Sequence, residues 1–184
     1  MIFPLFRRKQ RGPDTISTLY GMIVAQARLP TFYRDYAVAD TVNGRFDLIV
    51  LHLAMVLDRF AHDGGLQSLG QGVFDRFCQD MDHNLREMGV GDLKVPKEMR
   101  RMGEAFYGRA QAYRAAWSAA DNGVLVETLE RNIFGGASAD SGAAQRLAAY
   151  TREALRDLAA QPSANLADGE LHFPDPGKIP MPIS

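Results

Sequence analysis

Apolar side chains recur along most of this chain at the three- and four-residue spacing of an α-helix, and no segment carries a convincing strand pattern. The clearest stripe runs from Leu66 to Met88. Gly89 then ends that helix, because glycine readily takes the left-handed conformation that follows a helix. Helices are predicted over about residues 14–28, 31–36, 41–62, 66–88, 96–120, 125–133 and 141–158. We therefore expect an all-α, single-domain bundle of six or seven helices.

The predicted bundle occupies residues 13–160 and lies between two segments of different composition. Residues 1–12 place apolar side chains directly before basic ones, which fits either a frayed terminus or contact with anionic lipid headgroups. The side chains expected to make this membrane contact are Phe3, Phe6, Arg7 and Arg8. Residues 161–184 hold five prolines and no periodicity, so we predict an irregular, extended tail along the surface.

The helix predicted over residues 41–62 is apolar on nearly every side. One stripe runs from Phe46 to Phe60, and a second, almost opposite, consists of Leu48, Leu51 and Met55. Helices that are apolar all round are usually buried, which favours a central place in the bundle. If the second stripe is open instead, it is the natural seat of an apolar ligand or a partner helix.

Length and charge narrow the classes of function. A chain of 184 residues with 46% hydrophobic residues can bury a core of its own. The net charge of −1 argues against a DNA-binding protein, because that task usually requires a strongly basic balance. A single cysteine, Cys78, excludes an internal disulfide, and no apolar run approaches the ~20 residues that span a bilayer. We therefore expect a soluble or peripheral protein.

Residues that commonly carry catalysis or bind metals occur without the spacing that such chemistry needs. Asp58 with His62, and Asp80 with His83 and Glu87, would each place carboxylates and imidazoles on one helix face. Di-iron bundles need a Glu-x-x-His motif on two helices, and this chain has none. Gly-x-Ser-x-Gly and Walker-type motifs are absent as well. We expect no enzymatic activity, no metal and no cofactor.

Several polar residues have both a structural and a functional interpretation. Asp80 and Asn84 lie inside or at the edge of the apolar arc of their helix, so they either bond to a neighbouring helix or form a recognition surface. His52 is predicted to be a hydrogen-bonded structural histidine. Four basic residues form either a solvated face or a contact for RNA phosphates or an acidic partner. These are Lys94, Lys97, Arg100 and Arg101.

Short segments in a fixed order provide a more specific signal. The most specific are Asp80-Met81-Asp82 and the run from Leu85 to Asp92. The others are Gln26-Ala27-Arg28 with Phe32-Tyr33, Gly44-Arg45-Phe46-Asp47 with Leu51-His52, and Phe106-Tyr107-Gly108-Arg109 with Ala112-Tyr113. Spread over about residues 18–134, this set resembles the ubiquinol–cytochrome c chaperone family, and several ordered matches are far more specific than one.

The resemblance implies an assembly chaperone for the cytochrome bc1 complex, which engages newly made cytochrome b or another assembly component. Mitochondrial members of the family work with a small partner protein near the exit of the ribosome. No transit peptide is evident here, so we expect a bacterial cytoplasmic protein, at the cytoplasmic face of the inner membrane. A eukaryotic source would place it on the matrix side, and contact with a ribosome stays open.

Charged residues within the matched segments are candidates for a buried network or for partner contacts. They are Arg45, Asp47, Arg86, Glu87 and Arg109. On the resemblance alone, Arg86 and Glu87 join Asp80 and Asn84 as candidate partner-binding residues.

The resulting hypothesis is that the protein holds an immature membrane subunit. Cytochrome b is a bundle of apolar helices, and such a client needs temporary cover for surface that lipid and haem later occupy. The predicted cover combines the second stripe with an aromatic turn: Leu48, Leu51, Met55, Phe32, Tyr33 and Tyr36. The alternatives are a lipid- or quinone-binding helical protein with the same stripe as a closed pocket, and a carboxylate/His metal enzyme.

Overall fold

A computed structural model describes residues 13–136 and 141–180, and within these residues the chain is all-α, as predicted. The helices are α1 (Pro13–Ala27), α2 (Pro30–Asp35), α3 (Val42–Ala61), α4 (Gln67–Glu87), α5 (Val95–Ser118), α6 (Asn122–Ile133) and α7 (Ser141–Ala160). A short helix α8 (Ser163–Ala167) and a 3-10 turn (Pro176–Lys178) follow. None of the described helices is long and apolar enough to cross a bilayer. The predicted lipid contacts at Phe3, Phe6, Arg7 and Arg8 lie outside the described residues.

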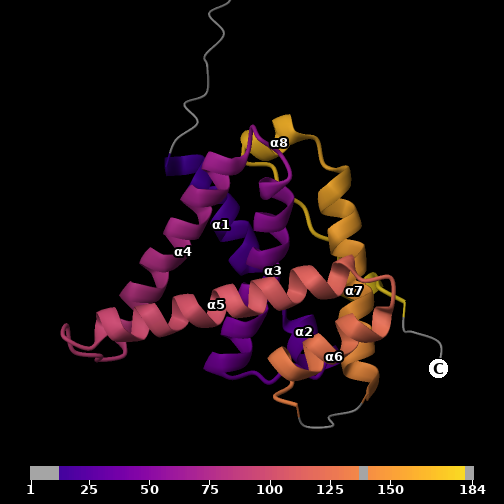
Figure 1. Cartoon of the computed structure of the whole chain (residues 1–184), viewed down its shortest axis with the longest axis horizontal. Helices are drawn as coiled ribbons and strands as arrows, with labels where there is room; N and C mark the ends of the chain where they lie inside the picture. The colour runs from indigo at the N-terminus through magenta and orange to yellow at the C-terminus, as the bar shows by residue number, and fades with distance from the viewer. Residues whose placement is uncertain (1–12, 137–140, 181–184) are drawn as a thin grey trace, which may run out of the picture.

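Helix α3 lies at the centre of the molecule and contacts α1, α4, α5, α6 and α7 (Figure 1). The side chains of Leu48, Leu51 and Met55 are completely buried. The prediction of a central position for α3 is therefore confirmed, and the alternative of an open second stripe is wrong. The physical reason is that a helix apolar all round would leave a wide hydrophobic face in water unless neighbours cover every side. The alternative of a closed lipid or quinone pocket uses this same stripe, which instead packs into the core.

The start of α3 depends on a close backbone approach. Thr41 caps the helix, and its Oγ1 accepts a hydrogen bond of 3.1 Å from the backbone N–H of Gly44. A Cβ atom at Gly44 would lie 2.0 Å from the carbonyl oxygen of Ala39, so only glycine fits at this position. The Gly44 segment of the sequence signature thus fixes how the chain enters its central helix.

The corner between α4 and α5 is built as the sequence predicts. Gly89 has a φ of +81°, in the left-handed region. Its N–H donates to the carbonyl of Arg86, the N–H of Val90 donates to the carbonyl of Leu85, and both N···O distances are 3.0 Å. This pair of bonds is the Schellman arrangement that ends helices at glycine. Helix α5 then begins at Val95, with a proline in its first turn.

The C-terminal segment is irregular, as predicted, yet it is packed into the bundle. Leu166 is completely buried, and Leu171 and Pro176 are also buried. The hydroxyl of Tyr36 donates to the carbonyl of Pro176 at 2.7 Å. The expectation of an extended tail along the surface is therefore wrong, because apolar residues without any helical period still fill gaps in a core.

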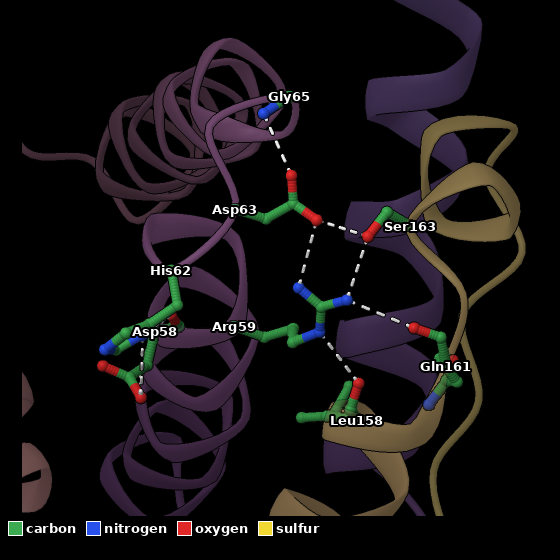
Figure 2. A network of polar contacts seen from close by, with 8 residues as sticks. All are labelled: Asp58, Arg59, His62, Asp63, Gly65, Leu158, Gln161 and Ser163. Carbon is green, nitrogen blue, oxygen red and sulfur yellow. Dashed lines mark hydrogen bonds and ion pairs between the residues drawn. The ribbon is translucent and has the colours of Figure 1, made fainter.

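A polar network joins the end of α3 to the end of α7 (Figure 2). The Nε of Arg59 donates to the carbonyl of Leu158 at 3.1 Å, and its Nη2 donates to the carbonyl of Gln161 and to Ser163 Oγ, each at 3.2 Å. Asp63 pairs with the same guanidinium at 3.5 Å and accepts from Ser163. The cation thus donates to carbonyls at a helix C-terminus, where the helix dipole also favours positive charge.

A buried polar chain lies beneath the C-terminal segment. The hydroxyl of Tyr150 lies 2.8 Å from His52 Nε2 and accepts a 3.0 Å hydrogen bond from the side-chain amide of Gln26. The Nδ1 of His52 lies 2.7 Å from the carbonyl of Leu48, so this nitrogen carries the proton and Nε2 accepts from Tyr150. His52 is fully buried, and its prediction as a hydrogen-bonded structural histidine is confirmed.

Mild acid is expected to destabilise the fold through His52. Burial lowers the pKa of His52 to about 4, although its bond to the Leu48 carbonyl opposes this shift. The imidazole of the unfolded chain titrates near 6.5, so stability is fully present above pH 6.5 and falls as the pH decreases toward 4. Between pH 7.5 and 5.0 the free energy of unfolding should drop by about 2 kcal/mol from this residue.

Urea unfolding at the two pH values measures this effect. The variant His52→Gln removes the titrating group, so its stability should change less with pH than that of the unmodified chain. His172→Gln, at an exposed histidine, is the matched control and should retain the full pH dependence. Equal pH dependence in the His52→Gln protein and the unmodified protein would show that His52 does not carry the effect.

Candidate functional site: an apolar groove on α3, α4 and α5

Two adjoining hollows of about 310 and 320 Å³ lie on the surface where α3, α4 and α5 meet. They share four lining residues, Leu57, Phe106, Tyr107 and Arg114. The first hollow continues onto α4 and is also lined by Phe60, Ala61, Gln67, Gly70, Gln71 and Phe74. The second continues along α5 and is also lined by Ala54, Ala110, Gln111 and Trp117. We call the two hollows together the α3–α5 groove.

Aromatic rings form the wall of the groove between α4 and α5. The ring centroid of Phe74 lies 5.1 Å from that of Phe106 and 5.6 Å from that of Tyr107. Phe106 is buried, whereas Tyr107 is 63% exposed. Exposed tyrosine offers a large apolar ring with a hydroxyl that can find a hydrogen-bond partner, a combination common at protein interfaces. The wall therefore presents apolar surface that the fold itself leaves partly uncovered.

Polar groups border this apolar surface. Arg114 Nε donates to Asp58 Oδ1 at 2.7 Å across the groove from α5 to α3. The side-chain amide of Gln71 donates to Asp75 at 2.8 Å. The buried indole N–H of Trp117 has no hydrogen-bond partner among the residues that the structure describes. The groove thus has an apolar floor and a polar rim, which suits a mainly apolar ligand with a few polar groups.

An ion pair with little solvent exposure fixes α5 against α3. Arg109 Nη1 lies 2.5 Å from Asp47 Oδ1, and the guanidinium also lies over the ring of Phe46, 5.9 Å from its centroid. Burial raises the pKa of Asp47, and Arg109 only partly offsets this effect. Because α5 carries Tyr107 next to this contact, the pair helps to set the geometry of the groove.

The charges of the sequence signature do not form one network. Among the ion pairs of the described residues, the pair of Asp47 and Arg109 is the one that joins two helices through signature charges, whereas three others pair locally. Arg45 pairs with Asp40, Arg86 with Asp82 and Asp92, and Glu87 with His83. Exposed charges pair most easily with residues close along the chain, and the pairs of Arg86 with Asp82 and of Glu87 with His83 are one helical turn apart.

Most of the side chains predicted to cover a client are inside the protein. Leu48, Leu51 and Met55 are completely buried in the core, as described above. Phe32 and Tyr36 are likewise completely buried. The Phe32 ring packs edge-on against the ring of Tyr150, with 4.9 Å between the ring centroids. The prediction that these five side chains form an accessible surface is therefore wrong. The core of a bundle of this size needs large apolar side chains to fill it.

Tyr33 is half-buried, and its hydroxyl donates to the carbonyl of Ala27 at 2.8 Å. It borders a separate hollow that also contains Arg28, Arg34 and Arg45. This hollow shares no lining residue with the α3–α5 groove. Tyr33 is therefore the one member of the predicted aromatic turn with access to solvent.

The two interpretations of Asp80 are resolved by a single contact. Its Oδ2 accepts a 2.8 Å hydrogen bond from the hydroxyl of Tyr20 on α1, which confirms the bond to a neighbouring helix. Burial and this carboxylate together raise the pKa of Tyr20. Asn84 is half-buried one turn further along α4, and Arg86 and Glu87 are exposed near the corner. None of these four residues lines the α3–α5 groove.

The predicted basic face is exposed at the start of α5. It consists of Lys94, Lys97, Arg100 and Arg101, of which Arg100 pairs with Glu104 at 3.1 Å. Within residues 13–136 and 141–180, no three side chains from histidine, cysteine, aspartate or glutamate lie close enough together to hold a metal ion.

The residue that the sequence reasoning missed is Tyr107. The sequence analysis identifies Tyr107 only as part of the sequence signature. A signal is present, because Tyr107 directly follows Phe106, which is buried in the core, and so points in a different direction from the helix. An aromatic residue on the outer face of a helix is the sequence pattern that indicates such a surface.

Comparisons with known proteins agree with one another. The model of the ubiquinol-cytochrome C chaperone family matches residues 34–173, a range that includes the whole groove. Assembly factor 1 of the ubiquinol-cytochrome-c reductase complex from Xenopus laevis is 23% identical over 156 residues, 84% of this chain and 78% of that protein. The Mus musculus assembly factor 1 is 26% identical over 141 residues, 76% of this chain and 48% of the mouse protein.

A solved structure extends this agreement to the fold. The crystal structure of the Cbp3 homolog from Brucella abortus aligns with a TM-score of 0.86 and 36% sequence identity. The alignment covers 98% of this chain and 100% of the other. Sequence and structure therefore indicate the same relatives.

Proposed function

Because the chain belongs to the ubiquinol–cytochrome c chaperone family, we propose that it serves the assembly of the ubiquinol–cytochrome c reductase complex by holding an apolar helix of newly made cytochrome b in the α3–α5 groove. The observation that carries this proposal is the aromatic wall of the groove, where Tyr107 is 63% exposed beside buried Phe106. The proposed client-binding surface is therefore the groove and not the buried stripe of α3.

The physical argument is one of temporary cover. Transmembrane helices of an unfinished subunit expose apolar surface that lipid, cofactors and partner helices will later occupy. A groove between helices can accept such a segment through side chains at helical spacing, and the two hollows offer seats for successive anchors. Binding to the unfinished form lowers its free energy and so limits its aggregation.

The groove also supplies partners for polar atoms of the client. The pair of Arg114 and Asp58 lies at its rim, and the exposed Tyr107, which carries a hydroxyl, lines both hollows. Because the client belongs in a bilayer, we place this activity at the membrane surface, on the cytoplasmic face in a bacterium or the matrix face in a mitochondrion. A small partner protein, as in mitochondrial members, would add surface beside the groove.

Replacement of Tyr107 tests the proposal. Tyr107→Glu places a charge on the exposed aromatic wall and should reduce co-purification of cytochrome b from native membranes by about tenfold or more, since burying an unpaired carboxylate is strongly unfavourable. Tyr107→Phe keeps the ring and should retain capture. Val42→Glu is the matched control at another exposed apolar residue, 73% exposed at the start of α3.

The measurement is the amount of cytochrome b recovered per mole of tagged chaperone, with circular dichroism to verify that each variant is folded. Equal recovery with Tyr107→Glu and with the unmodified chain would refute the groove as the client site. Recovery of a different subunit of the complex, lost in the Tyr107→Glu variant, would retain the groove and replace cytochrome b as its client.

A further inference from the structure

The corner between α4 and α5 carries exposed apolar side chains at a position remote from the groove residues of these helices. Leu93 is 98% exposed and Met88 is 62% exposed. Figure 1 shows the corner at the far left of the molecule, where α4 and α5 meet and no other helix approaches. We call Met88, Val90 and Leu93 the corner tip. An apolar tip that protrudes into solvent indicates contact with something outside the chain.

The corner tip is held in a rigid conformation. The two backbone hydrogen bonds around Gly89 end α4, and the N–H of Lys94 donates to the carbonyl of Gly91 at 2.7 Å. Arg86 forms ion pairs with both Asp82 on α4 and Asp92 in the corner. A binding element that is already ordered loses less conformational entropy when it binds, so this corner is suited to insertion as it stands.

The charges around the corner tip are equal in number but unequal in their pairing. Arg86 lies between Asp82 and Asp92, Glu87 contacts His83, and Glu104 pairs with Arg100. Among the described residues, Lys94, Lys97 and Arg101 have no ion-pair partner, and Glu98 is the one remaining acidic side chain on this turn of α5. The three cations are spaced three and four residues apart, so they share one face of the helix.

We propose that the corner tip inserts into the surface of an anionic lipid bilayer, with Leu93 and Met88 at the boundary between headgroups and acyl chains and with Lys94, Lys97 and Arg101 against lipid phosphates. A convex apolar tip needs no matching hollow in a fluid bilayer, whereas a protein partner must supply one. RNA phosphates would use the cations but leave Leu93 in water. The proposal concerns a surface separate from the groove and does not depend on the client.

A fluorescent probe at the corner tip tests insertion directly. Leu93→Cys in a Cys78→Ser background, labelled with an environment-sensitive dye such as NBD, is mixed with vesicles of phosphatidylcholine, with and without phosphatidylglycerol. We expect a blue-shifted, brighter signal only with phosphatidylglycerol, and a smaller signal at high salt because screening weakens the phosphate contacts. The same label at Val42→Cys, an exposed residue elsewhere, should not respond.

Unlabelled variants give the corresponding binding measurement. Met88→Ser with Leu93→Ser, and separately Lys94→Glu with Lys97→Glu, should each weaken flotation of the full chain with anionic vesicles by about tenfold. Val42→Ser should bind like the unmodified chain. Tyr107→Glu should also bind vesicles normally, so that failure of the client site and failure of the lipid contact are distinguished.

Three results would overturn the proposal. One is no binding of the full chain to anionic vesicles. Another is vesicle binding during which the dye at residue 93 stays in water, since the lipid contact would then lie elsewhere. The third is a dye response to detergent-solubilised subunits of the complex but not to vesicles, which would assign the corner tip to a protein partner.

Discussion

Gly44→Ala is expected to lower the free energy of unfolding by ~3 kcal/mol, the upper range for overpacking at a site that cannot relax easily. The added Cβ atom would lie 2.0 Å from the carbonyl oxygen of Ala39 and 3.1 Å from its carbonyl carbon. Both are backbone atoms, so no side-chain rotation relieves the overlap. The helix start must move instead, which also disturbs the cap between Thr41 and the N–H of Gly44.

Urea unfolding monitored by circular dichroism measures this loss. Gly103→Ala is the matched control, because Gly103 lies inside α5 and a Cβ atom there meets nothing within 4 Å. Alanine is a better helix former than glycine, so this control should gain roughly 0.5–1 kcal/mol. If the two variants unfold at the same urea concentration, the close approach of Ala39 to the helix start is not present in solution.

Removal of residues 162–184 is expected to prevent folding of the remaining chain. The deletion takes buried Leu166 and Leu171 out of the core and leaves the hydroxyl of Tyr36 without its acceptor. It also removes Ser163 from the contacts of Arg59. A truncation of one buried leucine to alanine typically costs about 2–5 kcal/mol, so losing both leucines and their neighbours is comparable to the ~5–15 kcal/mol stability of most proteins.

Circular dichroism and urea unfolding of the truncated chain give the result, and point variants keep the test informative if that chain is lost to proteolysis. Leu166→Ala should destabilise the full-length protein by about 2–5 kcal/mol. Ala164→Ser, on the exposed side of the same short helix, should change stability by less than about 0.5 kcal/mol. Cooperative unfolding of the truncated chain with unchanged stability would contradict the packing of this segment.

The two proposed contact surfaces lie on the same pair of helices. Tyr107 on α5 borders the groove, and Leu93 lies in the corner that starts α5. A chaperone that touches the bilayer with one end of α5 and holds a client further along it would keep an unfinished membrane subunit close to lipid. Loss of capture in a corner-tip variant on membranes, but not in detergent, is the pattern that such coupling produces.

The sequence by itself determined the helices and the family. The stripe from Leu66 to Met88 predicted α4 within one residue at each end, and Gly89 takes the left-handed conformation expected of it. The resemblance to the ubiquinol–cytochrome c chaperone family is confirmed by the family model and by the Brucella abortus structure. Such features are readable because helical period and capping depend on residues close together in the chain.

Only the tertiary structure decided which apolar surfaces are covered. A helix such as α3, apolar all round, contains no signal for which side is open, and its neighbours bury Leu51 and leave Tyr107 on α5 exposed. The C-terminal segment lacks a hydrophobic period, so the sequence alone does not predict the burial of Leu166 and Pro176. Burial depends on which segments meet in space, and contacts between residues far apart in the chain leave no periodic trace in the sequence.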